Sequence, residues 1–258
     1  MARCTKEEAL ATRYRLLDAA EHVFSEKGVS RTSLHDIAQA AGVSRGAIYW
    51  HFKNKADLFN AMMERITLPM DEVLHQTGQD PRLDPLEELH CAILSAIRKI
   101  VSDERTRRVF EVATLKVEYV DELLAVKARH VKSHAGAVCQ MRRSLLDAST
   151  RRAVPLTISP LIASQGLHGL VVGLINSWLL SPEVFELVET VDVAIKTYFA
   201  GLGLLFGTAL PTGVGQHLRF RHGVSSINPS PSAYPIAVFT ASRRKSVHTK
   251  LGVVDANK

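Results

Sequence analysis

Side chains that can donate hydrogen bonds gather between residues 45 and 51, where Arg45, Tyr49 and His51 lie within two helical turns. The planar guanidinium of Arg45 can bond both O6 and N7 of a guanine, which gives about 1–3 kcal/mol of discrimination between bases. Tyr49 and His51 have polar tips that suit phosphate oxygens, which accept many protein–DNA hydrogen bonds. These residue types at this spacing predict contact with double-stranded DNA.

Other residues of the same stretch leave alternatives open. Arg45 could instead contact only a phosphate, and Trp50 could either cover the groove wall or pack inside its own domain. Ala47 is small enough to let a helix lie deep in the groove and to touch a thymine methyl group. The ten residues predicted to contact DNA are Thr32, Ser33, Ser44, Arg45, Gly46, Ala47, Tyr49, Trp50, His51 and Lys55.

A helix-turn-helix is the element that would present these side chains. Apolar residues repeat at helical spacing over residues 34–41, and Ser33 with Asp36 has the spacing of a capping box at the start of that helix. Gly42 suits the end of the helix, because glycine accepts a left-handed backbone. Ser44 can then cap a second helix. This length and punctuation are typical of a motif that sets its second helix in the DNA major groove.

Helix starts provide further predicted phosphate contacts. Thr32 and Ser33 at the first helix of the motif offer hydroxyls and backbone amides, and Lys55 at the start of the following helix can do the same. Each phosphate neutralised should steepen the logarithmic salt dependence of binding by about 0.9.

The charge distribution gives this prediction modest support. The net charge is +6, but the segment after Pro211 has seven basic residues and one acidic residue, while the first 210 residues have 25 of each. The excess therefore belongs to the end of the chain. Within residues 1–55, nine Lys or Arg accompany six Asp or Glu, a local positive excess that favours a phosphate backbone.

Composition argues against several other classes of protein. The content of hydrophobic residues is 46%, as in globular proteins. Cys4, Cys91 and Cys139 are too few and too widely spaced for a disulfide framework or a zinc site. The first ten residues are not followed by the apolar region of a secretory signal. We therefore expect a reduced, cytoplasmic protein that is not an enzyme, with no catalytic residues, no metal site and no cofactor.

Helical periodicity continues to about residue 208, which predicts an all-α fold of about nine helices: a three-helix helix-turn-helix domain followed by a helical bundle. The helix that begins near Lys55 is expected to continue past Pro69, a residue that should kink or end it. The remaining expected helices are 6–27, 85–102, 104–116, 119–148, 161–181 and 183–206.

Residues 161–181 contain no charged residue, and a segment of this length can span a bilayer. Gly169 and Gly173 match a membrane helix-dimer motif. Polar interruptions and three glycines favour a buried helix approached closely by a second one. A membrane-tethered DNA-binding regulator is the alternative.

The stretch TSLHDIAQAAGVSRGAIYWHFKNKADLF, residues 32–59, resembles the DNA-binding domain of the tetracycline-repressor (TetR) family. AGVSRGAIYWHFKNKADLF and NSWLLSPEVFEL are most similar to AcrR-type repressors of multidrug efflux operons. The resemblance covers about residues 1–208 and is strongest in the first 60. It implies a helix-turn-helix domain at 1–55 and a ligand-binding and dimerisation domain at 56–208. Composition makes 209–258 a basic tail that we expect to be disordered.

The resemblance also implies how such a protein works. It would be a homodimer through its last two helices, at about 160–206, that represses an efflux operon from a pseudo-palindromic operator. A hydrophobic or cationic small molecule would release it, and regulation of another pathway is the alternative. The candidate ligand-binding residues are Met62, Ile66, Phe110, Glu111, Glu118, Gln165 and Trp178.

Overall fold

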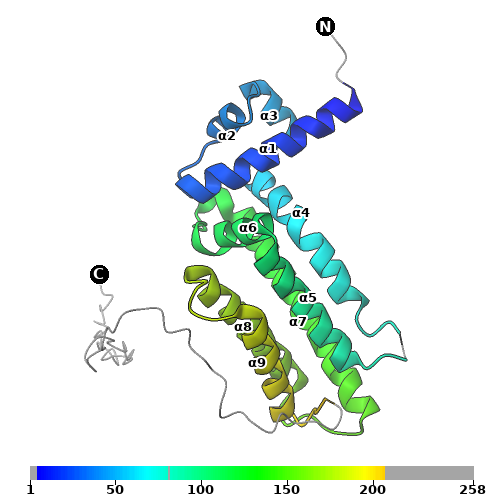
Figure 1. Ribbon diagram of the computed structural model, residues 1–258. Coiled ribbons are helices and arrows are strands. Elements are labelled where there is room, and N and C mark those ends of the chain that lie inside the picture. The colour runs from blue at the N-terminus through cyan, green and yellow to red at the C-terminus, as the bar shows by residue number, and fades with distance from the viewer. Residues whose placement is uncertain (1–4, 81, 207–258) are drawn as a thin grey trace, which may run out of the picture. The chain divides into compact units, whose positions relative to one another are not determined.

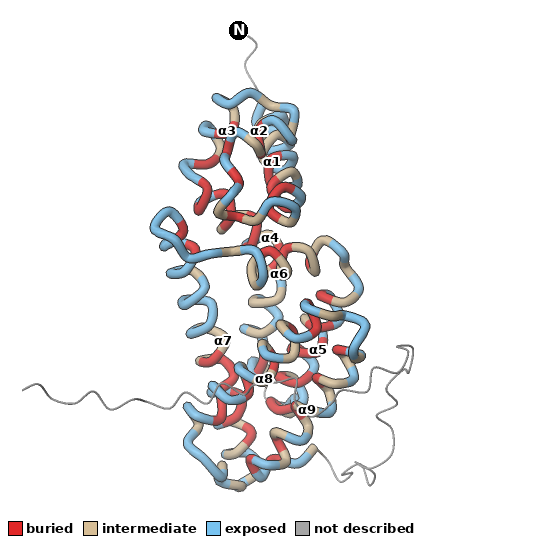
Figure 2. Tube along the Cα trace, turned by 90° about the vertical axis from the view of Figure 1, so that its left-hand side faces the viewer, coloured by how far each residue is buried: buried red, intermediate tan, exposed pale blue. Residues whose placement is uncertain are grey.

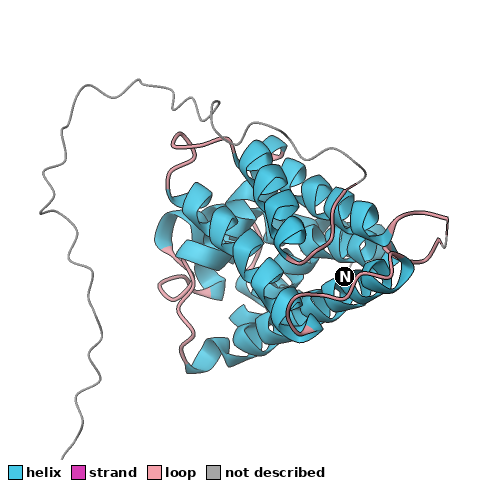
Figure 3. Ribbon diagram, turned by 90° about the horizontal axis from the view of Figure 1, so that it is seen from below, coloured by secondary structure: helices cyan, strands magenta, loops and turns pink. Residues whose placement is uncertain are grey.

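The computed structural model describes residues 5–80 and 82–206. Within them the chain forms helices and connecting loops without a strand, which confirms the predicted all-α fold (Figure 3). The helices are α1 (Lys6–Lys27), α2 (Leu34–Ala40), α3 (Arg45–His51), α4 (Lys55–Gln76), α5 (Pro85–Ser102), α6 (Glu104–Leu115), the 3₁₀ turn η1 (Asp121–Leu123), α7 (Leu124–Arg151), α8 (Pro160–Leu180) and α9 (Leu187–Gly201). The predicted tail at 209–258 lies outside the described residues.

Local capping accounts for the boundaries of the first helices. The Ser33 hydroxyl accepts the Asp36 amide while the Asp36 carboxylate accepts the Ser33 amide, which is the predicted capping box. Gly42 has φ of +65°, so it takes the left-handed backbone that ends α2 and turns the chain toward α3. The Ser44 hydroxyl caps α3 by accepting the Ala47 amide at 3.2 Å.

α4 continues past Pro69, as expected, and ends at Gln76, because an apolar face that packs on neighbouring helices outweighs one missing backbone hydrogen bond. Two other expectations about helix boundaries were wrong in detail. The helix expected from 119 begins with the 3₁₀ turn η1 and becomes α-helical at Leu124. α9 starts at Leu187 rather than 183, since turns and bends occupy the residues after α8.

Two clusters of buried apolar residues organise the helices. The first combines side chains of α1–α4 with Val109 and Val112 of α6 and with Leu123 and Val126 around η1. The second joins α5, α7, α8 and α9, and Phe110 packs against both clusters. α1–α3 lie at one end of this arrangement and α8 and α9 at the other, with α4, α5 and α7 running between them (Figure 1). Buried residues face the neighbouring helices, whereas the start of α7 is largely exposed (Figure 2). The helix-turn-helix therefore shares its core with later helices.

The uncharged helix α8 is one of the bundle helices. It packs between α7 and α9, and Tyr198 of α9 donates a hydrogen bond to the Ala163 carbonyl at 2.9 Å. A Cβ at Gly166 would collide with the Tyr198 hydroxyl, so this glycine permits the close approach that the sequence predicted. No helix among the described residues has both the length and the apolarity needed to cross a membrane.

A buried ionic cluster joins α1 to α4 and α6. Glu21 is 2% exposed, and its carboxylate accepts hydrogen bonds from Arg65 and, at 3.0 and 3.1 Å, from Arg105. Burial raises the pKa of Glu21, and the hydrogen bond from Arg65 opposes that rise. Asp18 pairs with both arginines at the exposed edge of the cluster.

We predict that Glu21→Gln lowers the free energy of unfolding by about 2 kcal/mol. Removing one partner of a buried ion pair costs roughly 3–5 kcal/mol, but here Asp18 still pairs with both arginines. Urea unfolding at neutral pH measures the change. Asp18→Asn is the matched control, because the Asp18 side chain is 51% exposed and its loss should cost less than about 1 kcal/mol. Equal destabilisation by the two variants would contradict a buried role for Glu21.

Candidate nucleic-acid interface

Burial on one side of α3 leaves the other side free. Ile48 and Phe52 are buried in the first cluster and fix the helix to α1, α2 and α4. The opposite side is made of predicted DNA-contacting residues: Ser44, Arg45, Gly46, Tyr49 and Trp50 are exposed, and Ala47 and His51 are half-buried. The structure therefore brings seven of the ten predicted residues together on one short helix and its cap.

Arg45 lies at the first position of α3, at the end expected to enter the groove. It is exposed, and no hydrogen bond or ion pair to its guanidinium occurs within the described part of the chain. Its five donors are thus available to a base or a phosphate.

The position of Trp50 decides one of the open alternatives. Its side chain is 74% exposed, and its ring meets the His51 ring edge-on at 4.7 Å between centroids. Packing inside the domain is therefore wrong for Trp50. A contact with the groove wall stays a prediction.

Arg13 of α1 supports the end of α3, and sequence reasoning missed it. Its guanidinium lies 4.5 Å from the centroid of the Phe52 ring and donates to the His51 carbonyl at 3.5 Å. Burial, together with the charge of Arg13, lowers the pKa of His51, so the imidazole favours its neutral form. The sequence contains no signal that pairs residues 38 positions apart.

The start of α2 is less open to phosphate than predicted. Thr32 is 2% exposed, and its hydroxyl donates to the Gly28 carbonyl at 2.7 Å. The Ser33 hydroxyl is used in capping and donates to Asp36 at 2.5 Å. Hydrogen bonds from Ser33 lower the pKa of Asp36 to about 2, so an ionised carboxylate already lies at this helix start. Neither hydroxyl is free.

The role predicted for the Lys55 side chain is wrong. Lys55 is 8% exposed, and its ammonium donates to the carbonyls of Ser30 and Thr32 at 3.1 and 3.0 Å. It also pairs with Glu122 of η1 at 2.6 Å. A buried ammonium needs such partners to offset its lost hydration, so this one is not available to a phosphate. Lys55 instead ties the loop before α2 to η1.

The seven candidate ligand-binding residues are divided between two clusters of buried residues and the surface. Met62 and Ile66 are buried in the first cluster and Trp178 in the second, while Phe110 packs against both. Glu111 is half-buried 4.0 Å from Arg107, and Glu118 and Gln165 are exposed. A cavity of about 590 Å³ lies instead between α5 and α9, and none of the seven lines it.

Two protein-family models match the chain over most of the described residues. One, described as "Bacterial regulatory proteins, tetR family", matches residues 16–62, and the other, "MAATS-type transcriptional repressor, C-terminal region", matches residues 84–203. The first match contains all ten residues predicted to contact DNA.

Individual proteins are similar over nearly their whole length. The transcriptional regulator TtgR of Pseudomonas putida is 35% identical over 205 residues, which cover 80% of this chain and 96% of TtgR. The structure of NalD from Pseudomonas aeruginosa has a TM-score of 0.69 at 35% identity, covering 76% of this chain and 98% of NalD. SmeT of Stenotrophomonas maltophilia, in its triclosan complex, has a TM-score of 0.69 at 31% identity, covering 81% of this chain and 99% of SmeT.

These matches agree with the architecture. The N-terminal match coincides with the helix-turn-helix and its exposed α3, and the C-terminal match spans α5 to α9. The chain therefore belongs to the TetR family of bacterial transcriptional regulators.

Proposed function

We propose that this protein is a dimeric, ligand-responsive repressor in which α3 reads a pseudo-palindromic operator. The observation that carries the proposal is the exposed side of α3, with Arg45 at its start, whose guanidinium has no partner among the described residues. One such helix contacts too few base pairs for useful selectivity. A two-fold dimer supplies a second reading helix at a fixed spacing.

The outward sides of α8 and α9 support a homodimer through residues 160–206. Apart from the backbone of α8 itself, no atom of the described residues lies within 4 Å of where a Cβ would be at Gly169 or Gly173, so a second helix can approach them closely. Exposed Ile162 on α8 and Val193 on α9 add apolar area that association would bury. This pattern fits a four-helix interface between two copies.

Similarity to efflux repressors supports control of a multidrug efflux operon. NalD is described as the secondary repressor of the MexAB-OprM multidrug efflux pump, and SmeT as the repressor of the SmeDEF pump. The SmeT complex with triclosan supports a hydrophobic small molecule as the releasing ligand. For this chain we propose a hydrophobic or cationic compound bound among the helices that follow α3.

The shared core provides a physical route from such a ligand to DNA. Arg105 of α6 holds Glu21 of α1, and Glu122 of η1 holds Lys55 beside the loop before α2. The Val29 amide also donates to the Lys116 carbonyl at the end of α6, at 3.0 Å. A ligand that favours another position of α6 or η1 would therefore move α1 and α4. The distance between two recognition helices would change, and operator affinity with it.

We predict that Arg45→Ala removes operator selectivity while dimerisation is retained. Loss of one bidentate contact per protomer should reduce the preference for operator over unrelated DNA, by about 1–3 kcal/mol for each half-site. Competition binding with operator and scrambled duplexes measures the ratio, and sedimentation measures the dimer. Unchanged selectivity would remove Arg45 from base readout and leave it a phosphate contact.

We predict that Lys55→Met leaves the salt dependence of DNA binding unchanged and lowers stability. The ammonium bonds to protein groups, so its loss should leave the carbonyls of Ser30 and Thr32 without their hydrogen-bond donor. The number of DNA phosphates that the protein neutralises should not change, and the salt dependence should therefore stay the same. Binding measured across a salt series gives the slope, and urea unfolding gives the stability. Exposed Lys53, changed to Met, controls for loss of one positive charge in the same region. If the slope of log K against log salt becomes shallower by about 0.9 in Lys55→Met, the prediction is wrong and Lys55 contacts a phosphate.

A further inference from the structure

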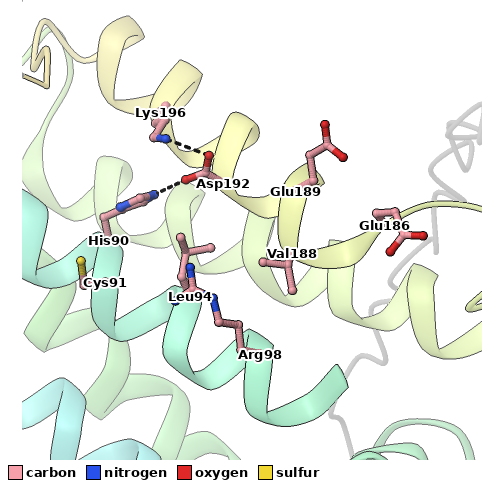
Figure 4. Close-up of a pocket in the computed structure, with 9 residues that line it drawn as sticks. All are labelled: His90, Cys91, Leu94, Arg98, Glu186, Val188, Glu189, Asp192 and Lys196. Carbon is pink, nitrogen blue, oxygen red and sulfur yellow. Dashed lines mark hydrogen bonds and ion pairs between the residues drawn. The ribbon is translucent and has the colours of Figure 1, made fainter. Parts of the chain in front are cut away.

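A cavity lies between α5 and α9, and none of the residues predicted to contact DNA lines it. Its volume is about 590 Å³, within the range of about 300–1,000 Å³ typical of small-molecule sites. Its lining comes from α5, from α9 and from Glu186, which lies directly before α9 (Figure 4). The lining residues are His90, Cys91, Leu94, Arg98, Glu186, Val188, Glu189, Asp192 and Lys196. We refer to it as the α5–α9 groove.

At one end of the groove the polar side chains bond to one another. Asp192 of α9 lies between two donors, with one carboxylate oxygen 2.7 Å from His90 Nε2 and the other accepting from Lys196 at 2.8 Å (Figure 4). His90 is almost fully buried and also packs edge-on against Phe206. This end is built to hold α5 and α9 together, and its charges have partners.

The other end carries charges that do not pair with each other. Arg98 projects from α5, while Glu186 lies at the start of α9 and Glu189 one turn further on. All three are exposed, and within the described residues no hydrogen bond or ion pair involves the side chain of any of them. Buried Leu94 and half-buried Val188 provide apolar surface beside them. In Figure 4 the Arg98 guanidinium is directed toward Leu94, while the carboxylates of Glu186 and Glu189 are directed away from it, at the outer edge of the opposite wall.

We propose that the α5–α9 groove is a second ligand site, which binds a small zwitterion with an apolar body. An anionic group of the ligand would take the donors of Arg98, a cationic group would pair with Glu186 and Glu189, and the body would cover Leu94 and Val188. A simple cation lacks a partner for Arg98, and a simple anion is repelled by the two glutamates. The balance of charge across the groove therefore selects a molecule with both.

The site differs from the one proposed for the releasing ligand. None of the candidate ligand-binding residues between α4 and α8 lines the groove. Zwitterion binding is measured without DNA, so either proposal can fail without the other.

Calorimetric titration of the full-length protein with 4-(aminomethyl)benzoate tests the site, with benzylamine and benzoate as matched single-charge compounds. Arg98→Gln and the double variant Glu186→Gln/Glu189→Gln remove the two sets of charges. Exposed Arg143 and Glu183, each changed to Gln, are controls outside the groove. Alkylation of exposed Cys91, located by mass spectrometry, reports occupancy at the groove itself.

We expect saturable binding of the zwitterion that slows Cys91 alkylation. Affinity should fall at least about tenfold in Arg98→Gln and in the glutamate double variant, because each loses charge-assisted hydrogen bonds, and it should stay unchanged in the controls. Absence of saturable binding at millimolar zwitterion would overturn the proposal. So would binding that survives Arg98→Gln, or benzylamine binding as tightly as the zwitterion.

Discussion

The buried carboxylate of Glu21 ties the DNA-reading end of the chain to the rest of the molecule. Arginines from α4 and α6 converge on it, and their guanidinium groups can only donate, so both carboxylate oxygens are held as acceptors. Lys55 is a similar link in which the buried group is a cation: its ammonium joins the loop before α2 to Glu122 of η1. Ionic groups buried at these places fix one relative position of α1, α4 and α6, because any other position would leave a charge without a partner.

This constraint explains how a small helix can be both rigid and adjustable. α3 is held by Ile48 and Phe52 in a core that also contains Val109 and Val112 of α6. A displacement of α6 is therefore resisted by packing and by the Glu21 pair at once, and it is transmitted to α1 as a unit. In the proposed dimer through α8 and α9, such a displacement would change the spacing of the two α3 helices.

Sequence reasoning succeeded where structure is decided locally. The boundaries of α1, the capping box of α2 and the turn at Gly42 follow from residues within a few positions of each other. It failed where a distant segment decides. Lys55 resembled a surface phosphate contact because Glu122, its partner, lies 67 positions later. The ligand-binding candidates were chosen from the family resemblance alone. In the structure they lie in two different buried clusters or on the surface. The α5–α9 groove had no sequence signal, since its walls come from helices about 100 residues apart.

We propose that the protein binds operator DNA through α3 and is released by a small hydrophobic or cationic ligand. The most direct measurement is an electrophoretic shift of the DNA immediately upstream of the protein's own gene, repeated with a panel of hydrophobic and cationic compounds. We expect a retarded band that resists excess unrelated DNA and is lost with at least one compound that does not unfold the protein. A protein that retards operator and unrelated DNA equally, at every salt concentration, would contradict it.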